Sequence, residues 1–81
     1  MTKDEAKVLV ALELERAESL YPKWPTDIVH QAAIVAEESG ELVQAANNLR
    51  WSHKGGTVAD CRKEAIQTAA MALRFLVNLK G

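Results

Sequence analysis

The chain contains little of several residue types, and each shortage excludes a class of protein. A single cysteine, Cys61, cannot form an internal disulfide and is too little for a thiolate metal cage, so we expect it to fill space between helices. The 11 acidic residues nearly balance the 10 basic ones, and the basic excess of a general nucleic-acid binder is missing. No apolar run approaches the roughly 18 residues that span a bilayer. No signal peptide precedes the fold, so we expect a cytoplasmic protein without a membrane partner.

Aromatic residues are also scarce, at 5% of the 81 residues, although hydrophobic residues reach 48%. The difference is made up by 13 alanines together with leucine, valine and isoleucine. Alanine is the best helix former, so the composition predicts one small all-α domain over residues 1–81. A lone chain of this length has a thin core, and we expect it to need a partner chain.

Proline and glycine gather in two clusters, at residues 21–26 and 51–57, and divide the chain into three segments. None of the segments shows the period-2 alternation of a strand, so they predict helices at about 3–20, 27–49 and 58–79. Thr26 or Asp27 is expected to cap the second helix, and Thr57 with Asp60 resembles a capping box before the third. Two helices of this length with a short connection should pack antiparallel.

The second predicted helix carries an acidic row beside an apolar one. Glu37, Glu38 and Glu41 place three carboxylates in about one turn, where like charges repel unless a cation compensates them. Antiparallel packing would bring Glu64 of the third helix level with these three. Oxygen ligands of this kind suit Mg²⁺ or Mn²⁺ rather than Zn²⁺. The competing interpretation is a solvated amphipathic helix, which shows the same acidic face.

The third predicted helix has apolar residues on two sides. Met71 and Phe75 share a side with Glu64. A second apolar arc lies opposite and consists of Ile66, Ala69, Leu73, Leu76 and Val77. One side can pack within the chain, which leaves the other for a second chain or a ligand pocket. The pattern therefore predicts a three-helix protomer that completes its bundle by homo-oligomerisation.

The run Ile-Val-Ala-Glu-Glu-Ser-Gly-Glu-Leu-Val-Gln-Ala at residues 34–45 resembles the Glu-Glu-x-x-Glu helix of a known family. The family is the MazG-like group of the all-α NTP pyrophosphohydrolase superfamily. Residues 63–76 resemble its later helix, and Tyr-Pro-Lys-Trp at residues 21–24 is similar to small phage-type and mobile-element members. The resemblance covers about residues 20–79. It implies a homodimer or tetramer that hydrolyses (deoxy)nucleoside triphosphates to monophosphate and pyrophosphate with Mg²⁺, in a house-cleaning role.

The resemblance also implies roles for the acidic residues. Glu37, Glu38, Glu41 and Glu64 would bind Mg²⁺ or activate water, with Glu38 and Glu41 as the catalytic pair. The family's second motif is Glu-x-x-Asp, but this chain carries Gln67 at the Asp position. Asp60, one turn before Glu64, is an alternative source of the missing carboxylate. The site then uses a variant ligand set, holds fewer ions or has reduced activity.

Five further residues are expected at the substrate, and each also has a structural interpretation: His30, Arg50, Trp51, Lys54 and Asn78. The arginine and lysine would hold phosphate oxygens or be solvated surface charges. The tryptophan, like Trp24, would stack on a base or seal one end of the bundle. The histidine would contact nucleotide or a polar interface, and the asparagine would line the pocket or cap its helix.

Two other functions stay open at this level. One is a non-catalytic helical interaction module, a degenerate relative in which Gln67 has abolished full metal binding. The other stays inside the superfamily, as a phosphoribosyl-ATP-type or dUTP-type pyrophosphohydrolase, and differs only in its substrate. A nucleic acid polymer is not expected as a partner in any of these cases.

Overall fold

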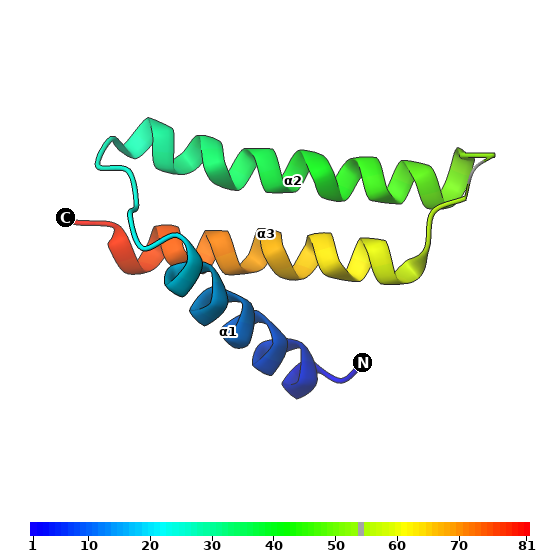
Figure 1. Ribbon diagram of the computed structural model, residues 1–81, viewed down its shortest axis with the longest axis horizontal. Helices are drawn as coiled ribbons and strands as arrows, with labels where there is room; N and C mark the ends of the chain where they lie inside the picture. The colour runs from blue at the N-terminus through cyan, green and yellow to red at the C-terminus, as the bar shows by residue number, and fades with distance from the viewer. Residues whose placement is uncertain (54) are drawn as a thin grey trace.

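The computed structural model describes residues 1–53 and 55–81, which form three helices and their connections (Figure 1). Helix α1 spans Lys3–Leu20, α2 spans Ile28–Trp51 and α3 spans Val58–Asn78. The described residues contain no strand, which confirms the all-α prediction. Helix α2 continues to Trp51, beyond the predicted end near residue 49, so Arg50 and Trp51 lie in the helix and not in a loop. In the described part of the chain, no helix has both the length and the apolar character needed to cross a membrane.

The helix starts follow from local hydrogen bonds. The Asp27 side chain accepts a hydrogen bond from the His30 backbone N–H at 3.1 Å, which makes Asp27 the N-cap of α2. At the start of α3, the Thr57 side chain accepts from the Asp60 N–H and the Asp60 carboxylate accepts from the Thr57 N–H. This reciprocal pair is a complete capping box, even though Asp takes the place of the usual Glu.

The connection between α2 and α3 depends on two glycines. Gly55 has a φ of 74°, a left-handed conformation that side chains rarely adopt. A Cβ atom on Gly56 would come within 2.7 Å of the Leu49 backbone nitrogen. Both positions therefore need glycine, and they let the chain turn back tightly along α2.

Helix α3 is the centre of the fold. Figure 1 shows α2 running antiparallel to α3 along its whole length, as expected, while α1 crosses α3 diagonally on the other side. The chain therefore has one central helix with a neighbour on each of two sides. The molecule is elongated, with extents of 44, 28 and 22 Å.

The packed side of each helix coincides only in part with its predicted apolar row. On α2 the shielded positions are Gln31, Ile34, Val35, Glu38, Leu42 and Ala45. Val35 and Leu42 of the predicted apolar row are therefore packed, whereas its other members, Ile28, Ala46 and Leu49, are exposed. On α3 the Glu64 side is the shielded one, with Met71 half-buried, whereas Leu73, Leu76 and Val77 of the opposite arc are exposed. Of the three α2 glutamates, only Glu38 lies on the packed side, whereas Glu37 and Glu41 are exposed.

The loop between α1 and α2 is fastened to α3 by a buried arginine. Arg74 is only 4% exposed, and its Nη2 donates a hydrogen bond to the Tyr21 carbonyl oxygen at 2.6 Å. The same guanidinium lies over the Trp24 ring at 4.8 Å from the centroid. From α2, the buried Gln31 side chain donates to the Pro25 carbonyl oxygen at 2.7 Å. Buried hydrophobic residues in the described chain are few and small (Ala17, Ala45 and Ala70), so these polar contacts position the loop.

Candidate metal centre

Three carboxylates converge where α2 and α3 run side by side. Glu38 and Glu41 come from the middle of α2, and Glu64 comes from the first half of α3. One oxygen of each lies within 4.8 Å of the others, and we call this group the carboxylate triad. The antiparallel packing creates it, because it brings residues of different helices to the same level. The spacing suits one cation bound by three oxygen ligands.

The carboxylate triad is partly removed from solvent. Glu38 and Glu64 are half-buried, and Glu41 lies at the exposed edge. One oxygen of Glu38 and one of Glu64 are buried without a hydrogen-bond partner. Burying an unpaired carboxylate oxygen is costly, and a cation relieves the cost. The triad therefore offers three oxygen ligands, two of them on residues with an unpaired buried oxygen, to a cation.

The electrostatics of the carboxylate triad agree with its geometry. Burial raises the pKa of the Glu38 carboxyl above its ordinary value, and the charges of Glu41 and Glu64 raise it further. Burial likewise raises the pKa of Glu64, followed by the effect of the adjacent Glu41 carboxyl. Lys63 partly opposes the shift at Glu64. Three like charges in one space hold protons more tightly until a metal ion displaces them.

Helix α1 adds a charged pair that the sequence analysis did not connect with the site. Glu13 is close enough to Glu38 for its charge to raise the pKa of Glu38. Arg16 binds Glu13 through two hydrogen bonds of 2.9 and 2.7 Å and holds the pKa of Glu13 below its ordinary value. In the sequence this pair is an ordinary i,i+3 ion pair. Its proximity to Glu38 depends on the crossing of α1 over α3.

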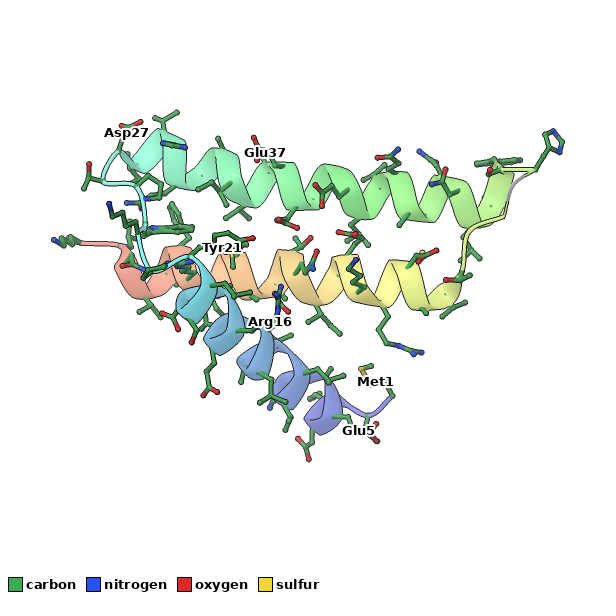
Figure 2. All side chains as sticks on the ribbon, in the orientation of Figure 1. Met1, Glu5, Arg16, Tyr21, Asp27 and Glu37 are labelled. Atoms are coloured by element: carbon green, nitrogen blue, oxygen red, sulfur yellow. The ribbon has the colours of Figure 1, made fainter. Side chains whose placement is uncertain are left out.

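Three predicted metal ligands lie outside the carboxylate triad. Glu37 is exposed, and Figure 2 shows it on the side of α2 that faces away from α3. Asp60 is exposed and its carboxylate caps α3, where it accepts from the Thr57 N–H. Gln67 is half-buried, one turn beyond Glu64 on α3. The carboxylate triad therefore includes Glu38 but not the adjacent Glu37, because Glu38 lies on the side of α2 that packs against α3.

The predicted substrate residues are spread along the bundle. His30 is exposed near the start of α2, about 12 Å along the helix from Glu38. Arg50 and Trp51 are exposed at the other end of α2, where the guanidinium lies 4.7 Å from the indole centroid. Asn78 donates its side-chain N–H to the Arg74 carbonyl oxygen at 2.8 Å and borders a hollow of about 260 Å³ beside Trp24. The prediction for Lys54 falls outside the described residues.

Comparison of the chain with protein-family models, curated proteins and solved structures gave no match in any of the three. Functional inference therefore depends on the residues and their arrangement.

The raised pKa values predict how stability depends on pH in metal-free protein. Between the ordinary glutamate value of about 4.3 and the raised folded-state values, the native state holds protons that the unfolded chain releases. The free energy of unfolding should therefore fall as the pH rises through this window. Thermal melts in a chelator between pH 4.5 and 7.5 measure this. The double variant Glu38→Gln/Glu64→Gln should show a flatter profile, and an equally steep decline in that variant would contradict the assignment.

Proposed function

We propose that the chain is a Mg²⁺-dependent nucleoside triphosphate pyrophosphohydrolase of the MazG-like type. The observation that carries the proposal is the convergence of Glu38, Glu41 and Glu64 from two helices, with two buried oxygens left unpaired. Apolar side chains at these positions would pack without the cost of burying charge. The sequence of residues 34–45, which resembles the acidic helix of that family, contributes two of the three carboxylates.

The substrate chemistry matches an acidic site that holds a divalent cation. A triphosphate is itself strongly anionic, so carboxylates can receive it only through a bridging metal ion. Bound Mg²⁺ would polarise the phosphoryl oxygens and stabilise the leaving pyrophosphate. Glu41 and Glu64 would hold the ion, with the Gln67 carbonyl oxygen as a neutral neighbour on α3. Glu38, whose pKa is raised above its ordinary value by burial and by the neighbouring carboxylates, would accept the proton of the attacking water.

The substrates would be deoxy- or aberrant nucleoside triphosphates of the cytoplasmic nucleotide pool, and the chain would act as a homodimer or tetramer. The test is the release of pyrophosphate and monophosphate from a panel of ribo- and deoxynucleoside triphosphates, with Mg²⁺ or with chelator. We expect turnover of at least one member with Mg²⁺ and none with chelator. Release of inorganic phosphate in place of pyrophosphate would exclude cleavage between the α and β phosphates.

The second candidate is a non-catalytic helical interaction module. The observation that favours it is Gln67, which leaves the triad one carboxylate short of the family pattern. In this case the bundle would serve assembly alone, and no nucleotide would be turned over.

Thermal melts with Mg²⁺ separate the two candidates. A cation that binds only the native state at about 100 times its Kd adds about 2.7 kcal/mol to the free energy of unfolding. For a domain of this size that raises the Tm by roughly 15 °C. Sodium chloride at equal ionic strength is the control, and Glu64→Gln should abolish most of the shift. A response to Mg²⁺ no larger than the response to sodium would favour the interaction module.

A further inference from the structure

The surface of the protomer is larger than its mass requires. The chain exposes 6041 Å², whereas a compact monomer of 8.9 kDa exposes about 4,800 Å². The excess of roughly 1,200 Å² is greater than the ~800 Å² that each partner contributes to a standard interface. Its radius of gyration is 13.8 Å, against about 11.7 Å for a compact domain of this length. The excess area is therefore sufficient for a stable dimer contact.

Helix α1 carries an exposed face with an acidic residue at one end, a basic residue at the other and leucines between them. The side that packs on α3 holds Ala6, Val10, Leu14 and Ala17, all shielded. A neighbouring face shows Glu5, Leu9, Leu12 and Arg16 at intervals of four, three and four residues, and we call it the α1 stripe. Figure 2 shows Glu5 and Arg16 at opposite ends of this stretch. Its apolar middle is open to solvent, with Leu12 56% exposed and the adjacent Val8 57% exposed.

Two hollows lie along the α1 stripe and share Leu9. The hollow nearer the N-terminus is bordered by Asp4, Glu5, Val8 and Leu9. The larger hollow, of about 450 Å³, lies between α1 and α3 and has an apolar floor of Leu9, Leu12, Ala59 and Ile66. Its charged rim consists of Glu13, Arg16, Arg62 and Lys63. One end of the surface thus carries two negative charges, and the other end carries a net charge of two positive.

We propose that the α1 stripe and the groove between α1 and α3 are the surface on which a second copy of this chain docks, antiparallel and about a two-fold axis near Leu9. Such a contact is isologous, so each end of one copy meets the opposite end of the other. Asp4 and Glu5 of one copy would face Arg62 and Lys63 of the next. At 1.5 Å per residue, Leu9 lies about 6–8 Å along α1 from the acidic pair. Leu9 also lines the same hollow as Arg62 and Lys63, so the basic groups lie beside the proposed axis. The apolar residues between them would be covered on both copies.

The charges that line the groove support this pairing, because its basic end keeps a net positive charge. Glu13 accepts two hydrogen bonds from Arg16, and the charge of Lys63 also acts to lower the pKa of Glu13 and of Glu64. Arg62 and Lys63 form no ion pair within the described chain. A docking helix with acidic residues at one end and leucines beyond them matches the sign of these charges and the apolar lining of the groove. The first two turns of α1 of a second copy supply that combination.

This inference rests on the self-association proposed above and is independent of hydrolysis. The experiment measures mass by light scattering after size exclusion, at micromolar to hundred-micromolar concentration. Wild-type protein should be at least a dimer. Asp4→Lys/Glu5→Lys and Arg62→Glu/Lys63→Glu should each weaken association by at least about tenfold, since charges of one sign then meet. Helical circular dichroism confirms that both variants remain folded.

The decisive step mixes the two charge-reversed variants in equal amounts. In a two-fold contact the lysines at positions 4 and 5 of one variant would meet the glutamates at 62 and 63 of the other, and the native pairs would form at the second end. Dimers should therefore reappear on mixing. Glu15→Lys/Glu18→Lys, on exposed α1 positions outside the hollows, is the control and should leave the mass unchanged.

Three outcomes would overturn the inference. A wild-type monomer throughout the range would refute self-association itself. If both charge-reversed variants remained dimeric, the interface would lie on another face. Two monomeric variants that fail to associate when mixed would exclude the antiparallel two-fold pairing. Turnover of nucleotide is measured separately on the same samples. The presence or absence of hydrolysis does not decide whether two copies associate through the α1 stripe.

Discussion

Glu38→Gln is expected to lower the rate of pyrophosphate release by roughly 10²–10⁴-fold, the usual contribution of a general base. Glutamine keeps the volume and polarity of the side chain but cannot accept the proton of the attacking water. Glu38 is well placed for this role because it is half-buried within the carboxylate triad and its pKa is raised. The loss should appear in kcat with little change in KM.

Glu41→Gln and Glu64→Gln should give a different signature. Both residues are assigned to the metal ion, so their loss should raise the Mg²⁺ concentration that gives half-maximal rate, and high Mg²⁺ should restore part of the activity. Glu15→Gln is the matched control, since it removes an exposed carboxylate from α1 outside the triad. Rates within about threefold of wild type for both Glu38→Gln and Glu41→Gln would refute the catalytic assignment.

The largest expected effect on stability comes from Arg74→Met. This change keeps the aliphatic volume but removes the hydrogen bond to the Tyr21 carbonyl oxygen and the contact with the Trp24 ring. A hydrogen bond that involves a charged group contributes about 1.5–3 kcal/mol, and a partly buried cation–π contact contributes about 1 kcal/mol. Relief from burying the guanidinium offsets part of this loss. We therefore expect a net loss of about 2 kcal/mol, or roughly 10 °C in Tm.

Two further variants make the arginine test specific. Arg74→Lys retains the charge but not the planar group that lies over Trp24, so it should fall between wild type and Arg74→Met. Lys7→Met, at an exposed position on α1, should change the free energy of unfolding by no more than about 0.5 kcal/mol. All melts need the same protein concentration, because self-association would also shift Tm. A Tm for Arg74→Met within 2 °C of wild type would show that the loop is held by other contacts.

Predictions from the sequence succeed where the cause is local. Proline, glycine and capping residues act within a few positions of themselves, so the three helices and a cap at Thr26 or Asp27 could be inferred without coordinates. The end of α2 was misplaced by two residues, because the breaking signal lies at the glycines and not at Trp51. The dense run of glutamates on α2 is likewise a local feature and points directly to the region of the candidate site.

Helix packing was predicted less well because hydropathy does not specify which side meets a neighbour. The apolar arc of α3 gave the stronger pattern, yet Leu76 and Val77 are exposed while the Glu64 side is shielded. The approach of Glu13 to Glu38 also escaped the sequence, since it depends on the angle at which α1 crosses α3. The same is true of Arg74, which looks in sequence like an ordinary surface arginine of an amphipathic helix.

The sequence by itself determined that this chain is helical, where its helices begin, and that Glu37, Glu38 and Glu41 share one turn. These properties follow from the backbone preferences of single residues and from a period of 3.6. Only the tertiary structure decided that Glu38 and Glu41, and not Glu37, meet Glu64, because neighbouring residues on a helix point about 100° apart and packing selects one of them. It also decided that acidic and basic ends face solvent along α1, since that surface exists only once α1 lies against α3.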